Sequence, residues 1–265
     1  MNAAAAVFVL APALAVGSFL NVVVARVPAR RSLLRPPSSC ASCGHEIGWK
    51  DNVPILSYFL LRGRCRHCGV SISPLYPLVE AVTAALIVSC VAVFGVTAYA
   101  ALAAAFCAVL VALSVIDLRH RIVPNRIVVP AAVVTLVAHT AIDPSVAWLA
   151  GALGASGFLF LAVLAYPKGL GMGDVKLALL LGAMLGGAVV VALLLGFVAA
   201  LVPSVVLFAR HGSGARKMAI PLVPFLSLGA VVALFFGQGL RRRNALPITR
   251  SRDVVDGNSA AIKPS

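Results

Sequence analysis

Long runs of apolar residues dominate this chain and set its predicted architecture. The runs lie at residues 3–25, 78–97, 100–116, 127–142, 147–166, 174–186, 188–209 and 219–239. Apolar runs of roughly 20 residues are typical of transmembrane helices, and unpaired backbone groups are too costly in lipid for open irregular structure. The pattern therefore predicts an all-α polytopic membrane protein with about eight transmembrane helices. Only Gly186 and Gly187 separate the sixth run from the seventh.

Composition supports this prediction and excludes other classes. The 265 residues are 61% hydrophobic and 11% charged, with a mean hydropathy of +1.03. Soluble domains are about half apolar and a quarter charged, so soluble, disordered and disulfide-rich secreted chains are excluded. The opening run is longer than a signal-peptide core and no basic residue precedes it. We expect an uncleaved helix with its N-terminus outside.

The formal net charge of +14 first suggests a nucleic-acid partner, but the position of the charges gives another explanation. The opposite loops, near residues 98, 143 and 187, hold no basic residue, whereas sixteen of the 22 basic residues fall in loops on one face. This positive-inside pattern assigns the basic face to the cytoplasm and removes the need for nucleic acid. The sixteen are Arg26, Arg30, Arg31, Arg35, Lys50, Arg62, Arg64, Arg66, Arg119, Arg121, Arg126, Lys168, Lys176, Arg210, Arg216 and Lys217. The other six lie in the tail, which eight spans would place outside.

One long polar segment, residues 26–77, interrupts the apolar pattern and holds four of the six cysteines. Cys40 and Cys43 are separated by 21 residues from the pair Cys65 and Cys68. A weak repeat underlies this spacing, since residues 40–47 resemble residues 65–72 and each pair is followed by glycine. Two such pairs are typical of a structural zinc site with Cys40, Cys43, Cys65 and Cys68 as its four ligands. Two disulfides are the alternative, which a reducing cytoplasm disfavours.

The chain is therefore expected to contain a first transmembrane helix (1–25), a cytoplasmic four-cysteine loop domain (26–77), a membrane domain (78–240) and a basic, disordered tail (241–265). A loop of this size with few large apolar residues is a marginal domain, so zinc would supply much of its folding energy. Cys90 and Cys107 lie inside predicted spans and are interpreted as packing residues.

Acidic residues are scarce, and three of them lie at the ends of predicted spans: Glu80, Asp117 and Asp174. Two spans separate Asp117 from Asp174, so both aspartates should meet the same membrane boundary. Carboxylates at membrane depth suggest function, and a close pair shares a proton, one member activating water while the other donates to a peptide carbonyl. The alternative is that each aspartate only marks the interface between lipid and water.

Neighbouring residues have candidate supporting roles. Gly171 and Gly173 would let a substrate backbone approach Asp174 closely, because they lack side chains. Lys176 would balance charge near Asp174, or serve as an ordinary interfacial anchor. Glu80 would orient substrate or cofactor, or only mark the interface.

Several motifs resemble those of a known family along nearly the whole chain. Gly171-Met172-Gly173-Asp174-Val175-Lys176 is similar to the GxGDxK signature of the type IV prepilin peptidases, which are bacterial membrane aspartyl proteases. Further blocks agree at residues 17–22, 51–54, 61–65, 73–80 and 116–119. Residues 220–225 depart from the pattern, with Leu222-Val223 where relatives often carry Phe-Gly.

The resemblance implies that Asp117 and Asp174 are the catalytic pair. They would cut a basic leader from a type IV prepilin or pseudopilin at the cytoplasmic face of the bacterial inner membrane. Relatives with the cysteine loop are commonly bifunctional and methylate the new N-terminal amine with S-adenosylmethionine. No residue is assigned to that cofactor, because the sequence has no dinucleotide-type signature. The competing hypotheses are a membrane zinc-domain scaffold or regulator without catalysis, and an ion-coupled transporter, although no convincing inverted repeat is present.

Overall fold

A computed structural model describes residues 3–167, 171–211 and 220–244. Within these ranges the chain is helical and forms no β-strand, which confirms the all-α prediction. Eight long helices correspond to the eight apolar runs. They are α1 (Ala3–Arg26), α3 (Leu75–Phe94), α4 (Ala98–His120), α5 (Asn125–Ile142), α6 (Val146–Ala165), α7 (Met172–Leu185), α8 (Val189–His211) and α9 (Val223–Asn244).

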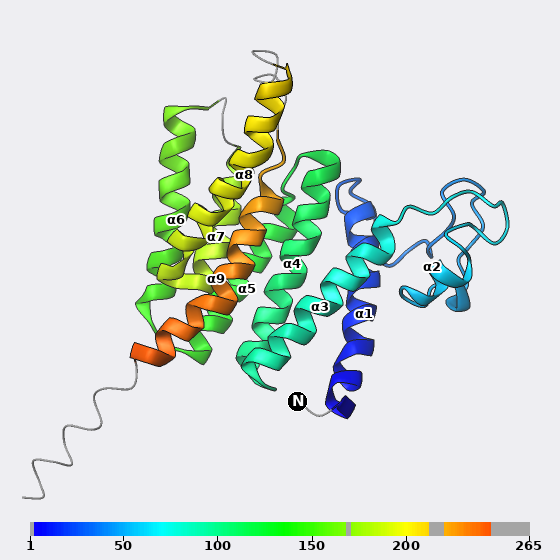
Figure 1. Ribbon diagram of the computed structural model, residues 1–265, viewed down its shortest axis with the longest axis horizontal. Helices are drawn as coiled ribbons and strands as arrows, with labels where there is room; N and C mark the ends of the chain where they lie inside the picture. Colours follow the sequence, from blue (N-terminus) through cyan, green and yellow to red (C-terminus); the bar gives the residue numbers. More distant parts are fainter. Residues whose placement is uncertain (1–2, 168–170, 212–219, 245–265) are drawn as a thin grey trace, which may run out of the picture.

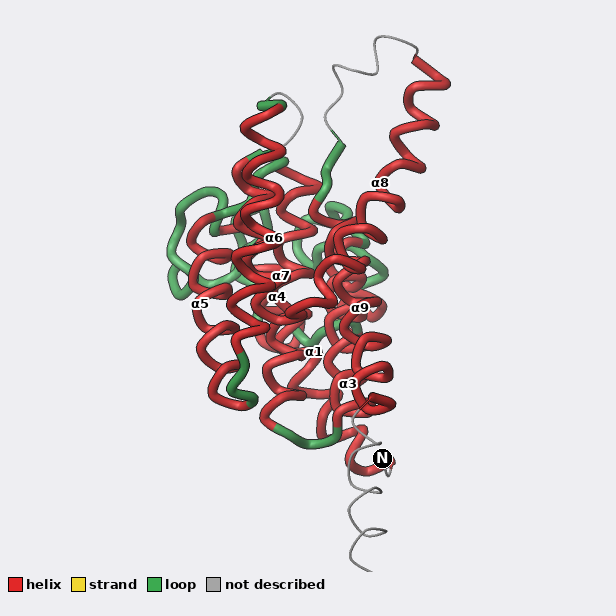
Figure 2. Tube along the Cα trace, turned by 90° about the vertical axis from the view of Figure 1, so that its left-hand side faces the viewer, coloured by secondary structure: helices red, strands yellow, loops and turns green. Residues whose placement is uncertain are grey.

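The helices cross back and forth in a bundle whose turns lie at its two ends (Figures 1 and 2). Neighbours in contact include α1 with α3, α3 with α4, α5 and α6 with α7, and α8 with α9. α4 and α7 supply much of the core, since Leu113, Ile116, Leu177 and Leu180 are fully buried. Exposed side chains of the other helices, such as Val133, Leu161 and Leu194, are also apolar, and six segments among the described residues are apolar and long enough to span a membrane. The bundle is a multi-pass membrane protein.

The predicted break near Gly186 is present and separates a short helix from a long one. α7 has 14 residues, and the 3₁₀ turn η2 (Gly186–Ala188) joins it to α8. Gly186 has φ +55°, and a Cβ there would lie 2.9 Å from the Trp148 ring. By length and hydropathy, six segments of the described chain qualify as membrane spans. The number is lower than eight because α7 and α8 count together as Met172–Arg210, and because the apolar part of α9 is shorter than a span. The turn divides that segment into two helices.

α6 and α7 pack at backbone distance because small residues face each other. A Cβ added at Gly182 would overlap the carbonyl of Gly151, and a Cβ at Gly151 would lie 2.6 Å from the carbonyl oxygen of Gly186. Small residues permit this close approach in membranes, where packing rather than hydrophobicity drives helix association. The contact holds α7, and Asp174 at its start, against the rest of the bundle.

The segment between α1 and α3 forms a small lobe beside the bundle (Figure 1). It contains the 3₁₀ turn η1 (Trp49–Asp51), the short helix α2 (Leu56–Leu60) and two isolated β-bridges. The lobe joins the end of the bundle at which α4, α6 and α8 finish and α5 and α7 begin.

Some residues of the sequence predictions lie outside the described residues: Lys168, Arg216, Lys217 and the tail beyond residue 244. The helix α9 continues four residues into the predicted tail.

Candidate active site

Asp117 and Asp174 lie at opposite ends of their helices, and both reach one end of the bundle. Asp117 belongs to the last turn of α4, which ends where Arg121 adopts the left-handed conformation (φ +54°) and donates its N–H to the Asp117 carbonyl oxygen. Pro124 prevents the helix from continuing. Asp174 lies in the first turn of α7, which begins after extended Gly171.

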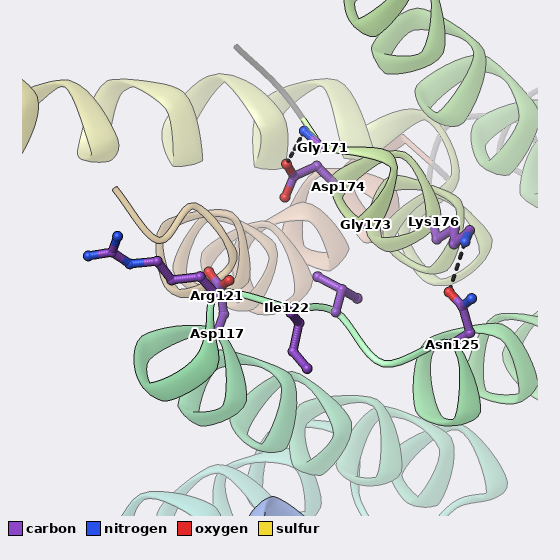
Figure 3. A pocket seen from close by; sticks show the side chains of 9 residues that line it. Asp117, Arg121, Ile122, Asn125, Gly171, Gly173, Asp174 and Lys176 are labelled. Carbon is purple, nitrogen blue, oxygen red and sulfur yellow. Dashed lines mark hydrogen bonds between the residues drawn. The ribbon is translucent and has the colours of Figure 1, made fainter. Parts of the chain in front are cut away.

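The two carboxyl groups line the same cavity, of about 330 Å³. Figure 3 shows them on facing sides of it, Asp117 from α4 and Asp174 from α7. The α4–α5 connection forms the remaining wall. The full lining is Asp117, Arg121, Ile122, Val123, Asn125, Gly171, Gly173, Asp174 and Lys176. The chain thus brings together two aspartates that are 57 positions apart.

Asp117 is buried and held by a backbone donor from a distant helix. The N–H of Val223, at the start of α9, donates to Asp117 Oδ2 at 3.1 Å. Val223 is one of the two residues at which the chain departs from the expected Phe-Gly pattern. Because the donor is a backbone N–H, this hydrogen bond is present although position 223 holds valine instead of the expected glycine. The pattern of side chains along the sequence could not have predicted a backbone contact of this kind.

Asp174 is partly buried and accepts a hydrogen bond from its own helix terminus. The N–H of Gly171 donates to Asp174 Oδ2 at 3.2 Å. The helix macrodipole stabilises a negative charge in the first turn of a helix and opposes one in the last turn. The two carboxyl groups therefore experience opposite helix fields, and Arg121 lines the cavity on the Asp117 side.

The two predicted glycines meet different surroundings. A Cβ at Gly173 would lie 2.9 Å from Cβ and Cγ2 of Val123, so this glycine is required for α7 to approach the α4–α5 connection. A Cβ at Gly171 would meet nothing closer than the Asp174 carboxylate, at 3.6 Å. Gly171 thus keeps an exposed backbone beside Asp174, whereas Gly173 serves packing.

Lys176 lines the cavity but turns away from Asp174. Its Nζ donates to Asn125 Oδ1 at 2.8 Å, which ties the start of α7 to the start of α5 (Figure 3). Asn125 and Arg121 were absent from the sequence-predicted site. Arg121 lies four positions after Asp117 and reaches the cavity with it, whereas only the packing of α5 on α7 brings Asn125 there.

Glu80 lies outside the lining of this cavity. Its carboxylate is buried in α3 and accepts the N–H of Ile55, from the lobe, at 2.7 Å. α1 passes close by, since a Cβ at Gly17 would lie 2.7 Å from Glu80 Cα. Glu80 therefore connects the membrane bundle to the lobe, and its predicted catalytic support stays a prediction.

The four cysteines of the lobe come together as a separate cluster. The sulfur atoms of Cys40, Cys43, Cys65 and Cys68 all lie within 4.8 Å of one another, with Cys40 Sγ and Cys68 Sγ at 3.8 Å. Tetrahedral coordination with metal–sulfur bonds of about 2.3 Å requires sulfurs about 3.8 Å apart. The donor set and its spacing fit a bound metal ion.

The sequence repeat is also a structural repeat. Cys40 N–H donates to the His45 carbonyl, and Cys65 N–H donates to the Val70 carbonyl, each at 2.9 Å. The β-bridges Ser39–Glu46 and Arg64–Ser71 repeat with the same offset, and Gly44 and Gly69 both have φ +70°. Two equivalent turns thus present two cysteines each.

Backbone hydrogen bonds favour the thiolate form of one of these cysteines, Cys40. The N–H groups of Cys43 and Ser42 stabilise the thiolate and lower the pKa of Cys40 to about 6.

Arg66 forms a salt bridge with Asp51 at 2.6 Å, and this contact holds the pKa of the Asp51 carboxyl below its ordinary value. Cys90 and Cys107 are buried inside the bundle, 4.0 Å apart, away from the cluster.

Comparison with known proteins assigns the family. Residues 12–94 match the bacterial peptidase A24 N-terminal domain, and residues 104–207 match the type IV leader peptidase family. The chain belongs to the type IV leader peptidase family. The first match contains the lobe with most of α1 and all of α3, and the second contains both aspartates. No solved structure matches this leader peptidase family member significantly.

Curated relatives carry the name prepilin leader peptidase/N-methyltransferase. The Burkholderia pseudomallei protein is 35% identical, over 87% of this chain and 85% of its own length. The Bacillus subtilis protein is 33% identical, over 86% and 92%. The Myxococcus xanthus protein is 43% identical over 68% of this chain, which spans 56% of that relative's length. The family and these matches make the chain an enzyme of the peptidase class.

Proposed function

We propose that this protein is a membrane aspartyl endopeptidase that removes the basic leader of type IV prepilin or pseudopilin precursors. The observation that carries the proposal is the single cavity lined by Asp117 and Asp174. The names of the curated relatives support the substrate class. The basic loops at the same end of the bundle support cleavage at the cytoplasmic face of a bacterial inner membrane.

In this mechanism the two aspartates share one proton. The first turn of α7 favours the ionised form of Asp174, which would take a proton from water as that water attacks the scissile carbonyl. Asp117, in the last turn of α4, would hold the shared proton and donate it to the carbonyl oxygen. The Val223 N–H occupies Asp117 Oδ2, so the other carboxyl oxygen is free to carry that proton.

The exposed backbone at Gly171 supports substrate access. Gly171 lines the cavity and has no side chain, so among the described residues it leaves room for an extended peptide to lie close to Asp174. Holding the peptide within reach of a fixed carboxyl pair contributes to the rate by orientation as well as by proton transfer.

We further propose that Cys40, Cys43, Cys65 and Cys68 bind one structural Zn²⁺. Four thiolates in a closed tetrahedral set are typical of structural zinc, which stabilises folding without entering the chemistry. The burial pattern supports this role, since Ser57 is the only buried residue between residues 27 and 74. A lobe with so little core requires another source of stability.

N-methylation of the new N-terminal amine is a second proposed activity, supported by the names of the relatives. S-adenosylmethionine would supply the methyl group. Neither the aspartate cavity nor the apolar cavity between α6 and α8 draws on residues 26–77. We therefore assign no residue to this cofactor.

Single changes of the two aspartates test the peptidase. Asp117→Asn and Asp174→Asn should each lower cleavage of a co-expressed prepilin by about 10³-fold or more, because each removes one proton carrier. Asp143→Asn, at the opposite end of the bundle, is the matched control and should cleave within about twofold of the parent. Cleavage that survives in either active-site variant would exclude the dyad.

A further inference from the structure

The lobe carries an apolar stripe that faces outward. Leu56, Phe59 and Leu60 of α2 share one helix face, and they are 54%, 68% and 70% exposed. Ser57, on the other face, is buried and accepts the Val53 N–H. Apolar residues at i, i+3 and i+4 normally face the core of a domain. In α2 the polar residue faces inward and the apolar residues face outward.

Trp49 is a further exposed apolar side chain, and it lies in the turn η1, which contacts α2. Its indole is 78% exposed, and the ammonium of Lys50 lies 5.5 Å from the ring centroid. Contiguous exposed apolar surface marks an interaction site, and tryptophan beside a basic residue is typical of membrane–water interfaces. Trp49, Leu56, Phe59 and Leu60 are called the lobe's apolar face below.

A hydrogen bond fixes the level of this face along the bundle. The buried Glu80 carboxylate of α3 accepts the N–H of Ile55, the residue directly before α2. Glu80 lies five residues after Leu75, where α3 begins, which is about 7.5 Å along the helix axis. The start of α2 is therefore held beside α3, at a level between the first residue of α3 and the middle of the bundle. Figure 1 shows the lobe alongside α1 and α3 rather than beyond them.

Ile55 itself supports the importance of this attachment. Its φ is +61°, a conformation that β-branched residues rarely adopt. Such strain persists only where surrounding contacts determine it. The Glu80 hydrogen bond is such a contact, and it positions the start of α2 at Leu56, the next residue.

The charge of the lobe matches one kind of partner. Residues 26–77 contain eight basic and two acidic residues. Basic segments next to membrane helices are attracted to anionic lipid headgroups within a Debye length of the surface. An apolar face on a basic lobe, held near the end of α3, fits the boundary between headgroups and acyl chains.

We propose that the lobe docks on the lipid leaflet at the basic end of the bundle, with Trp49, Leu56, Phe59 and Leu60 inserted at the headgroup–acyl boundary. The partner is an anionic bilayer surface. Docking would fix the lobe relative to α1 and α3, and it explains why a domain with almost no core exposes its largest apolar side chains.

Tryptophan quenching in the full-length protein tests this proposal. The chain has two tryptophans, and Trp148 is buried in α6, so the difference between the parent and Trp49→Phe reports Trp49 alone. The protein is reconstituted in vesicles of phosphatidylglycerol and phosphatidylcholine, with bromine at the upper acyl carbons. Bromolipid should reduce Trp49 emission by about half, and aqueous acrylamide should quench it several-fold less than free tryptophan.

Two variants sharpen the result. Phe59→Ser with Leu60→Ser should reduce the bromolipid quenching of Trp49 at least twofold, because the face then lacks its main apolar anchor. Val96→Ser, which changes an exposed apolar residue at the opposite end of the bundle, should leave it unchanged.

Two outcomes would overturn the proposal. Trp49 quenched freely by acrylamide and not by bromolipid would place the face in water. Trp49 shielded from acrylamide but not reached by bromolipid would mean that protein covers the face, either a second copy or a bound substrate.

Discussion

The aspartate cavity and the cysteine cluster are both built from residues distant in sequence, yet different forces hold them together. Asp117 and Asp174 are positioned by helices whose side chains, such as Leu113 and Leu177, are fully buried. The cysteines are positioned by two local turns in a lobe with almost no buried residue. Packing thus determines the first site, whereas hydrogen-bonded turns and a proposed metal determine the second.

This difference implies that the two regions can be disrupted separately. The bundle should keep its helices when the lobe loses metal, because apolar burial and helix packing do not depend on the cysteines. Conversely, a change at the dyad should leave the lobe folded. Two experiments test this independence and two test the surroundings of the dyad, from the largest expected effect to the smallest.

The dyad should behave as one unit. Asp117→Asn with Asp174→Asn should cleave prepilin no more slowly than either single variant, since a single loss already removes the shared proton. Rates measured on purified proteins in one lipid mixture give the comparison. Losses that multiply would mean that the two aspartates act independently. Metal content and lobe protease resistance, measured on the same samples, should match the parent.

Metal removal should affect the lobe and spare the bundle. Cys40→Ser, or a strong chelator, should lower the metal content from about one ion per chain to none and raise trypsin cleavage between residues 30 and 66 about tenfold. Circular dichroism should show helix content within a few per cent of the parent. Cys107→Ser is the matched control, because Cys107 is buried in α4 away from the cluster. Loss of bundle helicity would contradict separate stabilisation.

Gly173 should prove more sensitive than Gly171. Gly173→Ala places a methyl group 2.9 Å from Val123 and should lower cleavage about tenfold by shifting the start of α7. Gly171→Ala meets no such contact and should lose less than threefold. Gly173→Ala with Val123→Ala should recover most of the activity. Without that recovery, the glycine would act through something other than packing against Val123.

The hydrogen bond between Lys176 and Asn125 should have the smallest effect. Asn125→Ala and Lys176→Ala should each lower cleavage a few-fold, because one side-chain hydrogen bond contributes about 1 kcal/mol. The double variant should match the single ones if the residues act only through each other. A much larger loss for Lys176→Ala alone would show a direct role for its charge at the cavity. A double-mutant cycle on the cleavage rate measures the coupling.

The sequence by itself determined the helices and most of the residues that line the candidate site. Eight apolar runs became eight long helices, and Gly186 ends α7 because its positive φ and its contact with Trp148 exclude a side chain. The cysteine repeat became two equivalent turns, since each depends on neighbours within nine positions. Features that depend on hydropathy and on local backbone geometry can therefore be predicted from the sequence.

Tertiary structure decided which distant groups meet. The Val223 N–H reaches Asp117, Lys176 turns to Asn125, and Glu80 holds Ile55, and none of these pairs is close in sequence. Each depends on how helices pack side by side, which residue spacing along one chain does not specify. The outward stripe on α2 was hidden for a related reason: a five-residue helix shows its periodicity only when the folded lobe reveals which side is buried.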